Sequence, residues 1–527
     1  MAREEPYDAY IRPMLTDHYQ ITMAYSYWKN GSHMDPSVFE AFFRKCPFKG
    51  EFAVFAGVDE VQRFLKEFRF RVEEVDFLRT ALPQGCDEGF FQWLSSIDAS
   101  SLQVYALPAG TLCFPKIPVI RIEGPLAVAQ LCETTILNLI NFASLAATNA
   151  TRFVHAAGES KTMVEFGLRR AQGPDGAMTA SKYCYLGGFH ATSNVLAGMK
   201  HGIPVSGTHA HAYVSSYISE EDLKLRTLGD FDLMTLSKQY RDDMGVQGND
   251  GELVAFVSYA LAFPTHFLAL VDTYDTLNSG IPNFLCVALA LYKAGFQAVG
   301  IRLDSGDLSF ISRKARELFK SAALRYDLPF LASLTIVASN EINERVLLSL
   351  KEQGHEIDMF GVGTHLVTCQ SQPALGMVYK LVEIRGHPRI KLSDEKEKVT
   401  LPGKKLPYRL YGAGNIPLLD LLVPDNEQVP QPGERLLVRH PFEETKRAYV
   451  TPVRVECLSV LIWDHGTVLP LSTLEEGRSR VKQQMASMRQ DYTRFLNPTP
   501  YKVSVTDALF RYLAELWMKE LPIRELR

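Results

Sequence analysis

A stretch that joins an apolar run to two acids, Gln297–Ser309, has the clearest chemical character in the chain. Its first half, Ala298–Leu303, predicts a buried strand that ends at the run Asp304-Ser305-Gly306-Asp307. Two carboxylates around such a turn can hold ribose hydroxyl groups, or a Mg²⁺ ion that carries a diphosphate. Arg302, just before the turn, adds a positive charge. Together these residues favour a site for a phosphorylated sugar.

The same turn also has a purely structural interpretation. A basic amphipathic helix is expected over Phe310–Phe319, and Asp307 or Ser309 can cap its first turn. The backbone N–H groups and the positive end of the helix dipole would then face whatever lies above the strand. Taken alone, the four turn residues favour this capping role. Arg302 and the second acid shift the balance toward ligand binding.

Arginines and glycines elsewhere in the chain also suit anions. The guanidinium groups of Arg169, Arg170 and Arg302 can each fork onto a carboxylate or phosphate, which lysine cannot do. The alternative for each arginine is a salt bridge with a neighbouring acid. The run Gly361-Val-Gly363-Thr364 offers close backbone approach and a hydroxyl group, which is a weak signal for a phosphate cradle. No G-x-x-x-x-G-K-[ST] loop occurs in the chain.

Two histidines, His209 and His211, lie in the run Gly-Thr-His-Ala-His. In an extended segment they would share a face, as two metal ligands could, but no nearby Cys or Glu completes a zinc set. A single exposed histidine in a phosphate-rich site has another use, as a nucleophile that accepts a phosphoryl group. Read alone, the segment is more typical of ordinary loop histidines.

The elements that would position these residues alternate between strand and helix over residues 160–370. Six apolar segments predict strands: Met163–Phe166, Ile203–Ser206, Phe267–Val271, Ala298–Leu303, Leu334–Ala338 and Asp358–Val362. The helices expected between them include Ser193–Met199, Phe284–Ala294 and Glu341–Lys351. Six such units imply a parallel sheet, and their spacing fits a closed or nearly closed α/β barrel.

Every expected strand ends in a polar or glycine-rich cluster. The clusters are Gly167–Arg170, Gly207–His211, Asp272–Asp275, Asp304–Asp307, Ser339–Glu341 and Gly363–His365. Loops that follow parallel strands share one face of a barrel, where active sites are built. One polar turn carries little meaning, but six on one face predict a site.

The segments before and after the expected barrel do not alternate regularly between strand and helix. Before the barrel we expect helices over Thr16–Trp28 and Pro125–Asn149 and strands over Val38–Phe43 and Val119–Ile122. After it we expect strands over Met377–Ile384, Arg435–Arg439 and Arg454–Ile462, a charged surface loop over Ser393–Lys405, and helices over Leu474–Phe495 and Val505–Lys519. The chain is therefore divided into an α+β region (1–155), the α/β barrel (156–370) and a β-rich, then helical region (371–527). The first and last regions are expected to pack into one second domain.

Composition limits the kind of partner. The chain has 527 residues, and its 56 basic and 60 acidic side chains give a formal charge of −4. This balance provides no basic surface for nucleic acid or an anionic membrane. The eight cysteines are scattered without a C-x-x-C pair, which is typical of reduced thiols in the cytosol. We find no signal-peptide pattern and no run of eighteen apolar residues, so a cytosolic protein without a membrane span is expected.

Taken in order, these motifs resemble the nicotinate phosphoribosyltransferases, which are type II phosphoribosyltransferases. The matching segments are Leu15–Tyr19, Phe42–Phe48, Glu165–Asp175, Tyr185–Phe189, Thr192–Asn194, Gly207–His211, Arg302–Asp307 and Gly361–Thr364. The resemblance implies that nicotinate and 5-phosphoribosyl 1-diphosphate form nicotinate mononucleotide and diphosphate, with coupled ATP hydrolysis, in NAD salvage. It also implies Mg²⁺ or Mn²⁺ as a cofactor and a homodimer with shared active sites.

The resemblance also assigns roles to individual residues. Nicotinate would be bound by Arg302, Thr208 and Arg169, with Tyr19 stacking on its ring from the neighbouring subunit, although Tyr19's helical spacing alone is more typical of a core face. Phosphoribosyl diphosphate would contact a larger set: Asp304, Ser305, Gly306, Asp307, Gly363, Thr364 and Arg170. Asp304 and Asp307 would hold the metal ion, directly or through water or diphosphate. His211 would be the phosphorylated histidine, with His211, Asp304 and Arg302 as the catalytic residues.

Three alternatives remain at this point. A nicotinamide phosphoribosyltransferase would recognise a neutral amide with a carboxylate near the ring, but the segment Gly207–His211 contains no acid. A quinolinate-type enzyme would need more basic residues for a second carboxylate, and no ATP. A catalytically inactive barrel that serves as a scaffold has no need of six polar strand ends.

Overall fold

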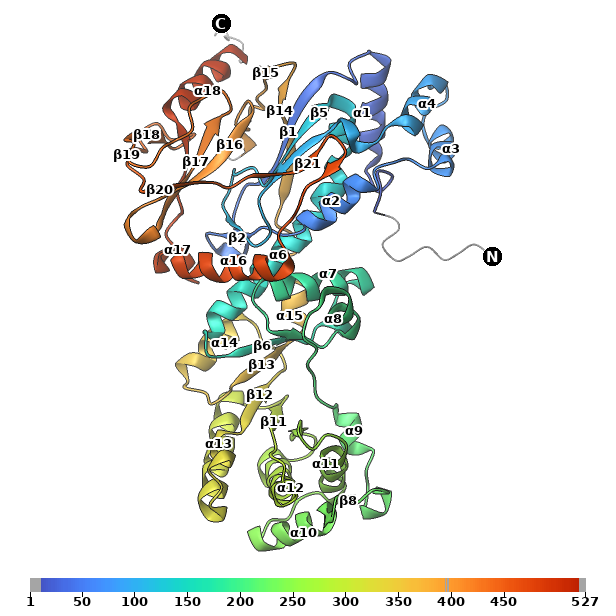
Figure 1. The fold of residues 1–527 in the computed structure, drawn as a ribbon, viewed down its shortest axis with the longest axis vertical. Helices are drawn as coiled ribbons and strands as arrows, with labels where there is room; N and C mark the ends of the chain where they lie inside the picture. The colour runs from blue at the N-terminus through green and yellow to red at the C-terminus, as the bar shows by residue number, and fades with distance from the viewer. Residues whose placement is uncertain (1–10, 394, 396–397, 521–527) are drawn as a thin grey trace, which may run out of the picture. The chain divides into compact units, whose positions relative to one another are not determined.

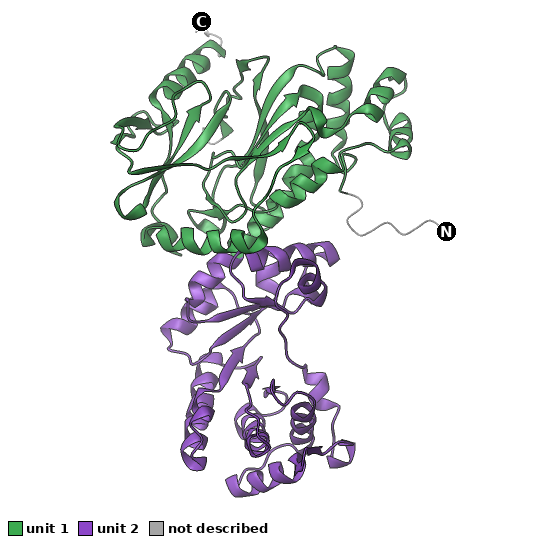
Figure 2. Ribbon diagram, viewed as in Figure 1, with its two compact units in different colours: residues 1–149, 371–527 green, residues 150–370 purple. Residues whose placement is uncertain are grey.

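The structure is a computed structural model, and it describes residues 11–393, 395 and 398–520. The chain folds into two compact units, shown in Figure 2. Unit 1 combines residues 1–149 with 371–527, and unit 2 is Ala150–Gln370. The colours of Figure 1 show that the beginning and the end of the chain both belong to unit 1. The sequence placed the boundaries at residues 155 and 370, close to these positions.

Unit 2 is built around a six-stranded, entirely parallel sheet with the order β10-β11-β12-β13-β6-β7. Its strands are β6 (Thr162–Glu165), β7 (Ala191–Thr192), β10 (Leu268–Leu270), β11 (Gly300–Leu303), β12 (Thr335–Ala338) and β13 (Met359–Val362). The parallel sheet and five of the six predicted strands are confirmed. The sixth, Ile203–Ser206, forms only an isolated parallel bridge between Val205 and Thr192.

The strand pairing in the sheet of unit 2 is open, so a fully closed barrel is not formed, whereas the nearly closed form that the spacing also allowed stays a prediction. The sheet has β10 and β7 as its edges, and no backbone pairing joins β10 to the Val205 bridge in the described part of the chain. A closed barrel would need a further strand between Val205 and β10. The chain there instead folds into helices and a short hairpin. The fold is mixed α/β.

Helices follow most strands of unit 2. They are α7 (Gly173–Leu186), α8 (Val195–His201), α9 (His211–Ser215), α10 (Leu233–Met244), α11 (Asp250–Ala262), α12 (Ile281–Lys293), α13 (Leu308–Tyr326), α14 (Glu344–Glu352) and α15 (Thr364–Val367). The helices predicted over 193–199, 284–294, 310–319 and 341–351 correspond to α8, α12, α13 and α14. α12 is the core helix of this unit, because every residue from Ile281 to Leu291 is buried.

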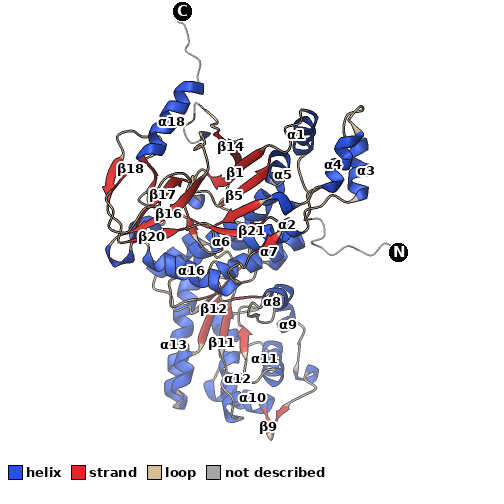
Figure 3. Ribbon diagram, turned by 45° about the horizontal axis from the view of Figure 1, so that its top comes forward, coloured by secondary structure: helices blue, strands red, loops and turns tan. Residues whose placement is uncertain are grey.

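Unit 1 contains two large sheets and a two-stranded one, in which β2 (Ala53–Val54) pairs with β4 (Leu112–Cys113); strands are red in Figure 3. The larger has the order β15-β14-β1-β5-β3-β21-β22, and in it β1 (Pro36–Phe43) pairs with both β5 (Ile120–Pro125) and β14 (Met377–Ile384). Its other members are β3 (Gln103–Ala106), β15 (His387–Pro388), β21 (Val460–Asp464) and β22 (Thr467–Val468). N-terminal and C-terminal strands thus share one sheet, as expected for a second domain made from both ends of the chain.

The smaller six-stranded sheet of unit 1 comes wholly from the C-terminal segment, in the order β19-β18-β23-β17-β16-β20. It comprises β16 (Lys405–Tyr411), β17 (Pro417–Pro424), β18 (Leu436–Arg439), β19 (Arg447–Val450), β20 (Arg454–Cys457) and β23 (Val503–Thr506). The single strand predicted over 454–462 is wrong. It divides at Leu458 and Ser459 into β20 and β21, which pair with β16 and β3 in different sheets.

The helices of unit 1 are α1 (His18–Lys29), α2 (Val58–Lys66), α3 (Val72–Ala81), α4 (Glu88–Ser96), α5 (Leu126–Leu131), α6 (Glu133–Ala157, which ends in unit 2), α16 (Leu474–Ser487), α17 (Gln490–Thr493) and α18 (Asp507–Glu520). The helix predicted over 474–495 is interrupted, because Met488 and Arg489 adopt extended backbone. The predicted loop 393–405 lies partly outside the described residues, and Lys405 at its end is buried in β16.

One helical stretch among the described residues, Leu126–Ala157, is long and apolar enough to cross a membrane by length and composition alone. The sequence predicted a mostly buried helix over the larger part of it, Pro125–Asn149. Its most apolar window is 61% buried inside the protein. That degree of burial is the environment of a core helix, which passes the same test of length and composition.

Candidate active site

The carboxyl ends of the parallel strands in unit 2 surround a cavity of about 440 Å³. Side chains or backbone that follow β6, β11, β12 and β13 line it, together with the segment that leads to α9. The lining residues include Arg302 and members of five of the predicted clusters, among them Arg169, Arg170, Thr208, His209, Asp304, Gly363 and Thr364. Several strand ends thus converge on one cavity, as expected from the sequence, and its volume is typical of small-molecule sites.

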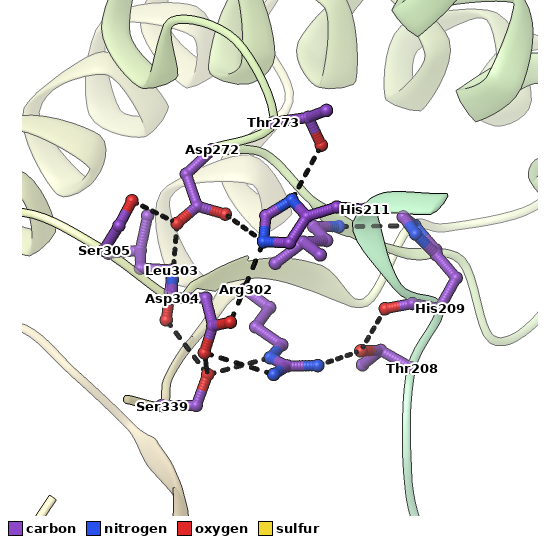
Figure 4. Close-up of polar contacts among 11 residues, drawn as sticks. Thr208, His209, His211, Asp272, Thr273, Arg302, Leu303, Asp304, Ser305 and Ser339 are labelled. Carbon is purple, nitrogen blue, oxygen red and sulfur yellow. Dashed lines mark hydrogen bonds and ion pairs between the residues drawn. The ribbon is translucent and has the colours of Figure 1, made fainter. Parts of the chain in front are cut away.

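Arg302 lies at the centre of the polar contacts that Figure 4 shows. Its Nε donates to Ser339 Oγ at 2.9 Å, one terminal nitrogen to Thr208 Oγ1 at 3.0 Å, and the other to Asp304 Oδ1 at 3.2 Å. Its guanidinium carbon lies 5.3 Å from the centre of the Phe166 ring. Three of the five N–H groups are used, so each terminal nitrogen keeps one donor for a ligand.

His211 is the first residue of α9, and its side chain is 46% exposed. Its Nδ1 lies 3.1 Å from Thr273 Oγ1, while Nε2 lies 3.7 Å from Asp304 Oδ2 and 3.9 Å from Asp272 Oδ1. Figure 4 shows the ring between these two carboxylates. An exposed imidazole held in this way can exchange protons or attack an electrophile.

His209 has the opposite environment, although it is only two residues away. It is buried, its Nε2 accepts the Leu270 N–H of β10 at 3.3 Å, and its ring packs edge-on against Tyr259 at 4.8 Å between centres. Burial lowers its pKa to about 4. His209 is therefore a neutral imidazole that fastens the segment to β10, which the sequence could not distinguish from His211.

In the sequence, Asp272 stands out only as a member of the polar cluster Asp272–Asp275. Its side chain is 1% exposed, and Oδ2 accepts the Asp304 N–H at 2.8 Å and the Ser305 hydroxyl at 2.6 Å. Its Oδ1, which faces His211, receives no hydrogen bond from the described residues. A buried carboxylate oxygen without a donor is costly, so this atom points to a missing partner.

The turn after β11 separates its two acids. Asp304 lines the cavity, where it contacts Arg302 and His211. Asp307 is exposed, and its Oδ1 accepts the Phe310 N–H at 3.0 Å as the N-cap of α13. Asp307 is not among the residues that line the cavity, and its binding of metal and substrate stays a prediction. Gly306, with φ of +77°, makes the turn between them.

Glu165 holds the loop that carries Arg169 and Arg170. Its buried carboxylate accepts hydrogen bonds from the Gly167 N–H, from Ser181 Oγ at 2.8 Å and from Thr192 Oγ1 at 2.5 Å. Neither arginine forms an ion pair within the range the structure covers, so both bring uncompensated positive charge to the cavity wall. The sequence could not assign Glu165 this role, because it precedes the polar cluster.

Two cavity-lining residues after β12 adopt backbone conformations that are unusual for non-glycine residues. Asn340 has φ of +80° and Glu341 has φ of +51°. Glu341 Oε2 lies 3.0 Å from Nε2 of His365, which also lines the cavity. Such conformations cost free energy and are concentrated at functional sites. The sequence placed residues 339–341 in a strand-end cluster but did not predict this strain.

Tyr19 lies on α1 in unit 1 and is 48% exposed, whereas every other predicted site residue belongs to unit 2. Asp304 and Asp272 are the carboxylates that fit a divalent cation, since Mg²⁺ prefers oxygen ligands and often takes one or two carboxylates together with substrate phosphates. Among the described residues no group of three or more His, Cys, Asp or Glu side chains could hold a metal ion by itself. A cation at this site would therefore need ligand oxygens from a bound substrate in addition to these carboxylates.

Comparison with known proteins identifies relatives of the whole chain. Models of the nicotinate phosphoribosyltransferase family match residues 14–141 (its N-terminal domain), 288–423 (the family) and 404–513 (its C-terminal domain). The chain is 52% identical to nicotinate phosphoribosyltransferase of Dictyostelium discoideum over 537 residues, covering 99% of the chain and 91% of that protein. It is 51% identical to nicotinate phosphoribosyltransferase 2 of Arabidopsis thaliana, covering 99% and 97%.

A solved structure is similar over nearly the same extent. The crystal structure of human nicotinic acid phosphoribosyltransferase superposes with a TM-score of 0.86 at 42% identity, and the match covers 95% of this chain and 99% of that one.

The capping role of Asp307 can be tested by the free energy of unfolding of its variants. Because Asp307 caps α13, Asp307→Ala should lower the free energy of unfolding by about 1 kcal/mol, whereas Asp307→Asn, which also caps, should change it by less than about 0.5 kcal/mol. Urea denaturation monitored by circular dichroism measures both. If Asp307→Ala is as stable as the unsubstituted protein, the capping role is wrong.

Proposed function

Because the chain belongs to the nicotinate phosphoribosyltransferase family, we propose that it joins nicotinate to 5-phosphoribosyl 1-diphosphate in NAD biosynthesis. The products are nicotinate mononucleotide and diphosphate. The pyridine nitrogen forms a bond to C1 of the ribose as the bond from C1 to the diphosphate oxygen breaks. The transition state has oxocarbenium character, so catalysis depends on positioning the two reactants and neutralising the leaving group.

The positive charge around the cavity is the observation that carries this proposal. Arg302 keeps two N–H donors on its terminal nitrogens, and Arg169 and Arg170 have no acidic partners in the described structure. Both proposed substrates are anions, one a carboxylate and the other a phosphate ester with a diphosphate. Arginine binds both groups through paired hydrogen bonds. A neutral amide substrate would leave this charge unmatched.

Each predicted residue then has a definite task. Arg302, with Thr208 and Arg169, binds the nicotinate carboxylate, while Tyr19 of the neighbouring subunit stacks on the ring in a homodimer. Asp304 binds the ribose hydroxyl groups. Asp307 binds them as well. A larger set, namely Ser305, Gly306, Gly363, Thr364 and Arg170, contacts the phosphates. The start of α15 supports the last of these tasks, because Gly363 and Thr364 line the cavity there.

Asp304 would hold Mg²⁺ or Mn²⁺ with Asp272, and with Asp307 as predicted from the sequence. The ion supplies neutralisation of the diphosphate leaving group when bound. The unpartnered Oδ1 of Asp272 supports its inclusion. We place the enzyme in the cytosol, in keeping with its scattered thiols.

His211 is the proposed link to ATP. A ring nitrogen attacks the γ-phosphorus, the bond from that phosphorus to the ADP oxygen breaks, and ADP leaves. Water later breaks the phosphorus–nitrogen bond and releases phosphate. The exposure of His211 and the burial of His209 support this choice between the two histidines. The phosphoryl group would add negative charge beside Asp304 and so change how the cation and diphosphate are held.

The proposed reaction is tested by its substrates. Purified protein with 5-phosphoribosyl 1-diphosphate and Mg²⁺ should form product from nicotinate at least about 100-fold more efficiently than from nicotinamide, because only nicotinate has a carboxylate for Arg302. ATP should raise the rate without being required. Preference for nicotinamide would favour the amide-specific alternative, and no product from either would favour the scaffold.

Arg302 should be needed for recognition of the carboxylate. Arg302→Ala removes a charge-assisted, two-point contact, so kcat/KM for nicotinate should fall by about 30- to 1000-fold, or ~2–4 kcal/mol. Arg313→Ala, an exposed arginine on α13, is the matched control and should keep full activity. Full activity of Arg302→Ala at low nicotinate concentration would contradict the assignment.

His211 should carry the phosphoryl group. Incubation with γ-labelled ATP should give an acid-labile, base-stable phosphoenzyme, which His211→Ala should lack while retaining a weak, ATP-independent transferase activity. His209→Gln is the control, since glutamine keeps an acceptor for the Leu270 N–H, and it should still be labelled. Label that persists in His211→Ala would show that another residue is the acceptor.

A further inference from the structure

A buried carboxyl group without a cationic partner lies behind the candidate site. Glu252, in the first turn of α11, has no exposed surface. Its Oε2 accepts the Ser279 hydroxyl at 2.5 Å and the Asn283 Nδ2 at 3.1 Å, while Oε1 accepts nothing from the part of the chain that is described. Such a group costs free energy that a buried leucine would avoid. Its retention in the core therefore points to a role other than packing.

The charges around Glu252 increase this cost. Burial, followed by the charges of Asp272 and Asp275, raises the pKa of Glu252 to about 7. On the neighbouring α10, Arg241 pairs with Asp250 at 2.7 Å instead of Glu252. No cationic side chain of the described residues pairs with the Glu252 carboxyl group. Its two hydrogen bonds to Ser279 and Asn283 are what hold it in place.

Those two hydrogen bonds fasten a π-helical turn, Thr276–Gly280, to α11 and to the start of α12. The Ser279 hydroxyl also accepts the Asn249 N–H at 2.8 Å, so this turn is tied to both the N-cap and the first turn of α11. At the end of the turn, a Cβ atom on Gly280 would lie 1.8 Å from the Val271 carbonyl oxygen. The backbone of Gly280 therefore packs closely against Val271, the residue before Asp272.

Asp272 and the next residue, Thr273, are two of the three groups that contact the His211 ring, as Figure 4 shows. We propose that Glu252 is a positioning residue: through Ser279 and Gly280 it fixes Asp272 and Thr273 against His211. The inference rests on the proposed function of His211 in ATP coupling. It assigns Glu252 no contact with substrates, so bond formation without ATP should depend on it far less than phosphorylation does.

The position of the turn is tested without ATP by hydrogen–deuterium exchange. Glu252→Ala and, as a milder change, Ser279→Ala should raise exchange at least about threefold in peptides covering residues 271–280. Peptides covering β11 should not change. Glu252→Gln, which keeps the acceptor oxygen, should restore protection. Unchanged exchange at 271–280 in both alanine variants would overturn the inference, whatever the role of ATP.

The link to His211 is tested with the same variants and γ-labelled ATP. Glu252→Ala and Ser279→Ala should slow formation of the phosphoenzyme by more than about 10-fold and ATP-independent product formation by less than about threefold. Glu252→Gln should phosphorylate at nearly the normal rate. Asp250→Asn, which removes an exposed charge from the same turn of α11, is the matched control and should behave as the unsubstituted protein.

The outcomes separate the two claims. Equal losses of phosphorylation and of ATP-independent transfer would make Glu252 a merely structural residue and overturn the positioning role. Failure of the unsubstituted protein to form any phosphoenzyme would contradict the proposed function of His211, and the exchange measurement would then decide by itself whether Glu252 fixes the Asp272 segment.

Discussion

The site depends on the way Arg302 is held near the end of β11. Its three hydrogen bonds join the segment before α9, the end of β12 and the turn after β11 through Thr208, Ser339 and Asp304. Without the guanidinium group, three polar strand ends would lose their common donor inside a partly buried cavity. The same bonds fix the direction of the two remaining terminal N–H groups. One side chain thus connects three segments of the cavity wall and adds to the positive charge that Arg169 and Arg170 also provide.

The surroundings of Arg302 divide into a buried layer and an exposed one. Asp272, which accepts hydrogen bonds from the Asp304 N–H and the Ser305 hydroxyl, belongs to the buried layer, as does His209, which is hydrogen-bonded to β10. His211 stands above this layer with nearly half of its side chain exposed. This arrangement suits a group that must meet a second, large substrate while remaining oriented by fixed oxygens.

The location of the cavity could be predicted from the sequence, because a general rule links the sequence pattern to the place of these residues in the fold. The polar clusters after apolar strands converge on one cavity, because the carboxyl ends of parallel strands share an edge. Closure of the barrel did not follow, since the spacing of strands does not reveal that Val205 forms a single bridge. α7 was missed because its start, Gly-Pro-Asp-Gly, has the composition of a turn.

Individual roles were harder to predict than the location of the site. Asp304 and Asp307 have equivalent places in the sequence motif, and only the course of the backbone directs one into the cavity and the other to the α13 cap. His209 and His211 differ likewise only in burial. From the sequence, Asp272 could be recognised only as a polar residue at the end of a strand. Its place in the site rests on an oxygen without a hydrogen-bond partner, which only the structure reveals.

The central claim is that Arg302 is the anchor of the nicotinate carboxylate. A crystal structure of the protein with bound nicotinate mononucleotide tests it most directly. The account predicts both carboxylate oxygens at about 2.7–3.2 Å from the terminal nitrogens of Arg302, with Thr208 beside them. A carboxylate bound elsewhere, with Arg302 still bonded only to Thr208, Ser339 and Asp304, would contradict it.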